Sequence, residues 1–298
     1  MSLIFLLKLF FINLFLILII FMKFLIGIKV LLCLIGKEEN KYIKELVNHY
    51  KKLRIKKIIL YDNNDINGEN FYDVLKPYIT HNFVEIIDYR GIFLPQLSAL
   101  NDCYHRYNNN YDWIAFYDID EFLEIINYTN INKFLTLPQF KKCESILINW
   151  KYYGDNNQLF YEPKPVIQRF SKAFYFINES IKNYKYLSSA AKTIVRGGLN
   201  ITWQLFPHYL NNTINCRADG SILKNYFSPP QFTVAYLKHY TTKSTEEFAE
   251  RLNKGDVNLF INDLYIKERI NNYYFLINNK TKEKLELLKE KLKYKIEF

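Results

Sequence analysis

The sequence predicts an α/β fold with a mostly parallel central sheet. Short apolar runs alternate with segments whose apolar residues recur at helical spacing, which is the pattern of right-handed βαβ units. Polar residues directly follow four of the apolar runs, at Lys37–Asn40, Asp62–Asn64, Asp88–Arg90 and Asp118–Glu121. Ligands bind along the carboxyl edge of open parallel sheets, so these four ends predict one functional site.

Residues 1–26 predict a hydrophobic anchor separate from the rest of the chain. Positions 3–24 are apolar except for Lys8, Asn13 and Lys23, and about 20 apolar residues suffice to span a bilayer. No small-residue cleavage site follows, which favours a single-pass membrane anchor over a secretory signal. Lysines are more numerous after this segment than before it, which favours a cytoplasmic location for the domain that follows. A start at Met22 would remove the anchor.

The clearest elements follow the anchor. Residues 28–35 are a continuous apolar run, which is typical of a strand buried on both faces. A helix is expected to open at Glu39-Asn40, because Ile43, Leu46, Val47, Tyr50 and Leu53 share one side. Further strands are expected at 55–61, 83–89, 113–117 and 145–150, and a second helix at 95–107.

The segment DWIAFYDIDE at 112–121 carries the most specific signal. An apolar strand ends abruptly in Asp118, Asp120 and Glu121. Unpaired carboxylates at a buried strand end repel one another and resist desolvation, and a divalent cation relieves both effects. If the strand continues, Asp118 and Asp120 share one face and can reach one Mg²⁺ or Mn²⁺ ion. The alternative is a solvated turn after an edge strand.

Composition narrows the class of partner. The net charge of +10 suggests an anionic partner, such as a phosphorylated ligand or a membrane surface. Because the lysines are scattered and no nucleic-acid motif is present, nucleic acid is not expected. The 49% hydrophobic content supports a packed core over disorder.

The cysteines and the asparagine motifs predict nothing special at this level. Cys33, Cys103, Cys143 and Cys216 are far apart with no C-x-x-C spacing, so ordinary core residues in a reducing compartment are expected. Asn-x-Thr matches, expected to be accidental in so Asn-rich a chain, occur at Asn127, Asn200 and Asn211.

The second half is less periodic, because glycines and prolines interrupt it, and it is expected to complete the sheet and form the side that faces an acceptor. Within the final unit, residues 276–298, a basic amphipathic helix is expected over 281–298. Its apolar face comprises Leu285, Leu288, Leu292 and Ile296. Such a helix either packs on the domain or lies on a membrane surface.

Eight segments carry a family resemblance. They are CLIGKEENKYIKELVNHYKKL, IILYDNN, DYRG, QLSALNDCYHRY, DWIAFYDIDEFL, INWKYYG, KTIVRGG and LKHYTTKSTEEFAERLNKGD. In this order, from Val30 to Asp256, they resemble glycosyltransferase family 92, a relative of the family 2 glycosyltransferases. The resemblance implies a Rossmann-like GT-A fold for a transferase domain over residues 27–275.

The resemblance also implies roles for particular residues. Asp118 and Asp120 would hold a divalent ion against a nucleotide diphosphate, and a C-terminal histidine, His208 or more favourably His239, would join the metal or the phosphate. Lys192, Arg196 and Lys243 would be phosphate partners. Seven residues would line the donor pocket: Lys37, Glu39, Asn40, Asp62, Asn63, Arg90 and Gln96.

The implied chemistry is inverting transfer from a nucleotide-sugar donor, with a UDP-sugar favoured, to a glycan or lipid-linked acceptor. Inversion needs a carboxylate base to deprotonate the acceptor hydroxyl. Asp155, just after INWKYYG, is the candidate, although the family often has a small polar residue there, and Glu179 and Asp219 remain open.

Two other functions compete with transfer. A phosphatase of the haloacid-dehalogenase type also places D-x-D at a strand end, but Glu121-Phe122 follows here and three βα units precede the motif. A membrane-tethered sugar-binding or interaction protein with a degenerate transferase fold is the non-enzymatic alternative.

Overall fold

The computed structural model describes residues 27–93, 95–173, 190–204, 208–224, 228–255, 269–270 and 281–293. The predicted anchor at 1–26 and the candidate base Glu179 lie outside these residues. Within the described part of the chain, no helix is both long and apolar enough to cross a bilayer.

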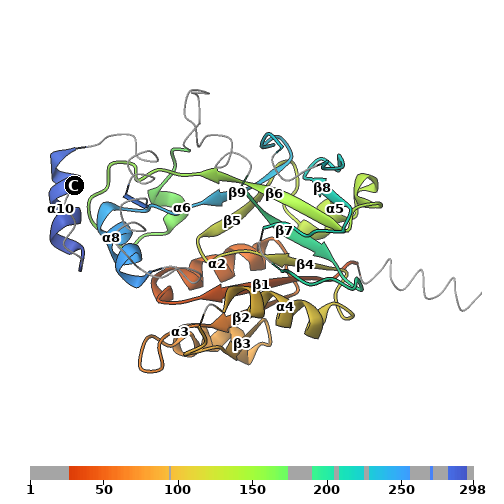
Figure 1. Cartoon of the computed structure of the whole chain (residues 1–298), viewed down its shortest axis with the longest axis horizontal. Coiled ribbons are helices and arrows are strands. Elements are labelled where there is room, and N and C mark those ends of the chain that lie inside the picture. Colours follow the sequence, from red (N-terminus) through yellow and green to blue (C-terminus); the bar gives the residue numbers. More distant parts are fainter. Residues whose placement is uncertain are drawn as a thin grey trace, which may run out of the picture.

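The described residues form a mixed, nine-stranded sheet that is mostly parallel (Figure 1). Along the sheet the strands run β3-β2-β1-β4-β7-β6-β9-β5, with β8 also paired to β6. Neighbours from β3 to β4 are parallel, whereas β7 is antiparallel to both β4 and β6. The strands are β1 (Val30–Gly36), β2 (Lys57–Asp62), β3 (Val84–Asp88), β4 (Trp113–Phe116), β5 (Glu121–Ile125), β6 (Ser145–Tyr152), β7 (Ala191–Arg196), β8 (Asn215–Arg217) and β9 (Ala235–His239).

Helices cover both faces of the parallel part, as its continuous apolar strands require. Alternate β1 residues face opposite ways: Leu32 and Leu34 pack in the cluster of α2 and α3, and Leu31 and Cys33 pack in the cluster of α4. The helices are α2 (Asn40–Lys52), α3 (Phe71–Thr80), α4 (Gln96–Tyr107), α5 (Ile131–Leu135), α6 (Val166–Arg169), α8 (Thr245–Lys254), α10 (Lys282–Lys291) and the 3₁₀ turn η1 (Pro138–Phe140).

The predicted strands and helices of the first half are confirmed with small shifts at their ends. Helix α3 was not expected, because Pro77 lies inside it and the preceding loop is rich in Asn. Asn70 caps this helix by accepting a hydrogen bond from the Tyr72 amide at 2.8 Å. Strand β5 was also missed, because it begins within the acidic motif at Glu121.

The C-terminal helix packs on the domain and is shorter than predicted. Helix α10 ends at Lys291, and residues 294–298, including Ile296, lie outside the described part. Leu288 and Leu292 are buried, and α10 lies beside α8 at one end of the molecule (Figure 1). The Asn253 side chain of α8 donates to the Lys291 carbonyl at 2.9 Å.

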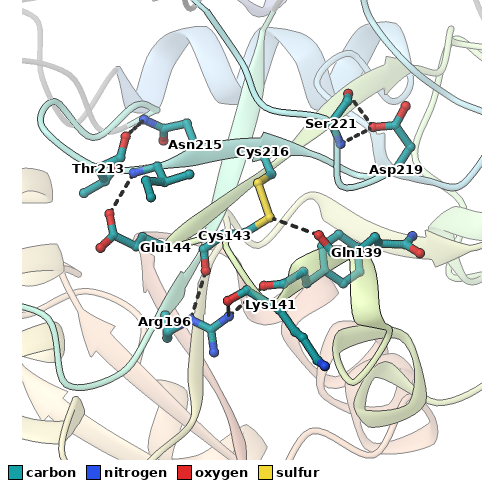
Figure 2. The surroundings of a disulfide bond; sticks show 12 residues. Gln139, Lys141, Cys143, Glu144, Arg196, Thr213, Asn215, Cys216, Asp219 and Ser221 are labelled. Carbon is teal, nitrogen blue, oxygen red and sulfur yellow. Dashed lines mark hydrogen bonds between the residues drawn. A yellow bond between two sulfur atoms is a disulfide. The ribbon is translucent and has the colours of Figure 1, made fainter.

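Two of the four cysteines form a disulfide, which corrects the expectation that all four are plain core residues. Cys143, just before β6, is bonded to Cys216 of β8, with the Cα atoms 5.7 Å apart (Figure 2). The Arg196 guanidinium donates to the Cys143 carbonyl at 2.9 Å beside the bridge. Cys33 and Cys103 are free and buried, as predicted.

Candidate active site

The acidic motif lies in a tight turn between β4 and β5. Strand β4 ends at Phe116, so the strand geometry that would put Asp118 and Asp120 on one face does not persist. The turn is closed by two hydrogen bonds, one from the Glu121 amide to the Asp118 carbonyl (3.2 Å) and one from the Asp118 amide to Glu121 Oε2 (3.0 Å). The two aspartates consequently have different partners.

Asp120, Glu121 and His239 form a buried cluster. Each offers one ligand atom, and these atoms lie within 4.8 Å of one another. Strand pairing explains the approach, because Glu121 stands opposite His239 in the antiparallel pair of β5 and β9. His239 Nε2 lies 3.6 Å from Asp120 Oδ1. The structure thus brings together Asp120 and His239, which were both predicted as metal ligands. Glu121, and not Asp118, is the third residue of the cluster.

Asp118 lies beside this cluster, on Lys192. Lys192 extends from β7, next to the residue that pairs with Phe116, so it stands at the carboxyl end of β4. Its Nζ is 2.9 Å from Asp118 Oδ2 and 4.0 Å from Glu121 Oε1, and its side chain is 4% exposed. Burial lowers the pKa of Lys192, but the Asp118 and Glu121 carboxylates outweigh it and raise that pKa overall. Lys192 is therefore a fixed cation at the rim of the cluster.

The pKa values of the two carboxyl groups in the cluster are shifted in opposite directions. Burial raises the pKa of Glu121 well above its usual value; Lys192 opposes this shift, and Asp118 and Asp120 add to it. Burial also acts on Asp120, but His239 and Arg251 outweigh it and hold its pKa well below the usual value. Arg251 Nη1 of α8 lies 2.6 Å from Asp120 Oδ2.

Two buried atoms of the cluster lack hydrogen-bond partners among the residues described, namely Glu121 Oε1 and His239 Nδ1. A buried oxygen and a buried nitrogen left in this state are costly unless another group completes them. Two carboxylates and an imidazole suit Mn²⁺ and related ions, and carboxylates alone also suit Mg²⁺. The residues present therefore fit a divalent cation.

The Trp150 ring packs against both predicted histidines, His208 and His239. Its ring centroid lies 4.4 Å from that of His239 and 5.2 Å from that of His208. Burial, Lys192 and His239 lower the pKa of His208 to about 3, so this imidazole is neutral at physiological pH. His208 thus borders the site, although it is not one of the three clustered residues.

Helix α8 brings further cations to the same edge. Lys254 forms an ion pair with Glu39 and donates to the Lys37 carbonyl at 2.8 Å. Lys243, just before the helix, is buried with its Nζ 4.3 Å from the Tyr42 ring centroid, and its φ of 54° is uncommon for a residue with a side chain. Burial lowers the pKa of Lys243.

The start of α8 is held rigidly. Ser244 and Glu247 form a reciprocal capping box. The same Glu247 carboxylate forms a buried ion pair with Arg169 and accepts from the Tyr42 hydroxyl at 2.8 Å. Sequence reasoning missed Arg251 and Lys254, although the S-T-E-E capping signal that locates their helix was readable.

Five of the predicted donor-pocket residues lie at the ends of β1 and β2, whereas Arg90 follows β3 and Gln96 begins α4. Asp62 is only 2% exposed, and its carboxylate accepts from Arg90 Nη2 at 2.8 Å and from Asn64 Nδ2 at 2.7 Å. The Asp62–Arg90 ion pair fixes the end of β2. Asn63, the next residue, is half-buried. The others are the half-buried Lys37, Glu39 and Asn40 and the buried Gln96.

Neither of the two candidate bases within the described residues, Asp155 and Asp219, is well placed for catalysis. Asp155 is fully buried, and its Oδ2 lies 2.5 Å from Lys284 Nζ of α10. An acceptor hydroxyl cannot reach such a carboxylate. Asp219 accepts from the Ser221 hydroxyl and from Gln231 Nε2, bonds that outweigh burial and lower its pKa, which makes it a weak base. Arg196 packs on Trp113 at the opposite strand end, away from the cluster.

Comparison with known proteins places this site in a family. Residues 29–286 match the sequence profile of glycosyltransferase family 92. The chain belongs to that family. Membership decides against the phosphatase alternative and agrees with the acidic cluster, which lies within the matched residues.

Two Arabidopsis thaliana proteins named galactan beta-1,4-galactosyltransferase share a shorter stretch. GALS3 is 38% identical and GALS2 37% identical over 73 residues, in each case 22% of this chain and 14% of the relative. The stretch they share with this chain thus spans only about one seventh of their length.

Solved structures match this chain at low identity and with TM-scores below 0.5. S. aureus TarS is 12% identical with a TM-score of 0.42, covering 83% of this chain and 43% of TarS. TarS 1–349 in complex with UDP-GlcNAc is 15% identical with a TM-score of 0.41, covering 88% and 71%. The mannosyltransferase PcManGT from Pyrobaculum calidifontis, in complex with GDP-Man and Mn²⁺, is 8% identical with a TM-score of 0.37, covering 89% and 74%.

Proposed function

We propose that this protein transfers a sugar from a nucleotide-diphosphate donor to a hydroxyl acceptor with the help of Mn²⁺ or Mg²⁺. The observation that carries the proposal is the buried cluster of Asp120, Glu121 and His239, whose ligand atoms lie within 4.8 Å of one another. A divalent ion there would supply charge stabilisation to the leaving diphosphate. The unpartnered Glu121 Oε1 in the cluster supports this use.

The lysines near the cluster have a second role in the proposal. Lys192 is held by Asp118 and Lys243 is buried near Asp120 and Glu39, so both cations are in place before the donor arrives. Charges fixed in advance stabilise developing negative charge better than mobile ones, because they need no reorganisation during the reaction. Both lysines would therefore bind the diphosphate oxygens.

The donor's nucleoside would lie over the ends of β1 and β2. Lys37, Glu39, Asn40 and Asn63 are the half-buried polar residues there, and the Asp62–Arg90 pair keeps the β2 end in position. We favour a UDP-sugar donor and a glycan or lipid-linked acceptor, as the family resemblance suggests. The segment 1–26 would tether the domain to a membrane.

The stereochemistry belongs to the proposal as well. We expect inversion at the anomeric carbon, which requires a base on the face opposite the leaving diphosphate. The product's anomeric configuration, measured by NMR during the first turnover, tests this directly. Retention of configuration would contradict an inverting mechanism without affecting the cation site.

The test of function is a donor screen with the full chain. UDP- and GDP-sugars are offered with Mn²⁺ or with EDTA, and binding is followed by calorimetry and transfer or hydrolysis by release of nucleotide. Binding and turnover that both need the metal are expected. Binding without turnover towards any acceptor would favour the sugar-binding alternative, and no binding in the presence of metal would overturn the proposal.

A further inference from the structure

The Cys143–Cys216 disulfide indicates the kind of compartment, oxidising or reducing, in which this domain folds. Cys143 and Cys216 are 1% and 0% exposed, and their bond joins the segment before β6 to β8 within the sheet (Figure 2). Disulfides of this structural kind form and persist in oxidising compartments and are rare where thiols are kept reduced. The bridge therefore favours an extracytoplasmic domain over the cytoplasmic one that the lysine distribution suggested.

If the domain folds in an oxidising secretory compartment, the Asn-x-Thr matches become candidate N-glycosylation sites. Such a sequence is the acceptor signal for N-glycosylation, which requires a surface position in the folded protein. Asn127, Asn200 and Asn211 are all exposed. Asn127 lies in the turn after β5 with a φ of 66°, Asn200 follows β7, and Asn211 lies in the turn before β8.

Strand register places these asparagines away from the acidic cluster. Strand β7 begins next to Lys192 at the cluster and runs away from it, so Asn200 follows the far end. Asn211 precedes β8, which starts beside Ser145 at that same far end. Asn127 lies six residues beyond Glu121, after β5 has led away from the cluster. Glycans at these positions would leave the cluster open.

We infer that Asn127, Asn200 and Asn211 are N-glycosylation sites of a domain that folds in an oxidising secretory compartment. In each modification the side-chain amide nitrogen forms a bond to the anomeric carbon of a lipid-linked oligosaccharide. The bond from that carbon to phosphate breaks, the lipid diphosphate leaves, and the amide loses one proton. The inference is independent of the proposed transferase activity.

The test uses the full chain expressed in eukaryotic secretory cells. Intact mass is measured before and after treatment with a peptide-N-glycosidase, for the wild type and for paired variants at each site. Thr129→Ala, Thr202→Ala and Thr213→Ala should each remove one glycan, whereas the matched Thr→Ser variants should retain it. These variants also separate the three sites from the matches at Asn178 and Asn279, two asparagines that lie outside the described residues.

A thiol count tests the compartment on the same material. Denatured protein should label at two cysteines without reductant and at four after reduction, because Cys33 and Cys103 are free. Four labelled cysteines before reduction would overturn the oxidising compartment. No mass change with the glycosidase, or unchanged glycan number in all three Thr→Ala variants, would overturn the glycosylation sites.

Discussion

Glu121 and His239 stand opposite each other across the antiparallel pair of β5 and β9, with Asp120 one residue away in the preceding turn. The sheet therefore sets the spacing of Glu121 and His239, and the tight turn before β5 adds Asp120. Because backbone pairing fixes both residues, the cluster is preorganised for a cation.

Glu121→Gln is the sharpest test of the ligand set. The change keeps the shape of the side chain and removes its charge, so Mn²⁺ affinity measured by calorimetry should fall by at least about tenfold. Glu124→Gln is the matched control, because Glu124 lies on the same strand but pairs with Lys238 at the surface. Equal Mn²⁺ affinity in the Glu121→Gln variant and the wild type would remove Glu121 from the site.

Lys192→Met should have opposite effects on metal and donor. The Lys192 ammonium is 2.9 Å from Asp118 and 4.0 Å from Glu121, so it competes with a bound cation. Its removal should tighten Mn²⁺ binding on the order of tenfold and weaken UDP binding in the presence of metal. Lys238→Met, at a surface pair, should change neither. Weaker Mn²⁺ binding in Lys192→Met would show that this lysine supports the cluster in another way.

Lys284→Met should destabilise the whole domain. Lys284 and Asp155 are both buried, so losing the lysine leaves a buried carboxylate without its counter-charge and should cost about 3–5 kcal/mol in urea unfolding. The double variant Lys284→Met/Asp155→Leu should recover most of that loss, because an apolar pair often replaces a buried ion pair. If the double variant is no more stable than the single one, the pair is not the source of the effect.

Stability should fall in mild acid because of His49. Burial lowers the pKa of His49; its bond to the Leu123 carbonyl and Glu124 oppose the shift, and Lys238 and Lys52 add to it. The unfolded chain takes up a proton near pH 6.5 while the folded chain resists it, so stability is present above that pH and is lost as pH falls below it.

The measurement is urea unfolding at pH 7.5 and 5.5. His49→Gln should lower overall stability yet lose less of it between the two pH values than the wild type. His81→Gln, at an exposed histidine, serves as the control. A pH dependence that is identical in the His49→Gln variant and the wild type would assign the acid sensitivity to other groups.

Local pattern was enough to predict the framework of the fold. The apolar run of β1 and the helical spacing of Ile43, Leu46 and Tyr50 mark elements whose neighbours are close in sequence. The same signal located the acidic motif at the end of β4. The rule that ligands bind at carboxyl strand ends predicted one site at these polar residues, and the family resemblance assigned donor-pocket roles to them.

Long-range pairing explains what the sequence alone could not supply. No residue close to Glu121 in sequence indicates that His239 is its neighbour. The assignment of Asp118 as a metal ligand assumed that strand geometry continues through the acidic motif, whereas β4 ends at Phe116. Asp155 was chosen by its place after INWKYYG, but Lys284, far along the chain, neutralises it. The Cys143–Cys216 bond spans 73 residues and has no local signature.

The most direct measurement is an anomalous difference map at the manganese absorption edge, from crystals of the protein grown with MnCl₂ and UDP. The account predicts one strong peak within bonding distance of Asp120, Glu121 and His239, adjoining the UDP diphosphate. Bound UDP with no manganese peak at these three residues, or a peak held by other side chains, would contradict it.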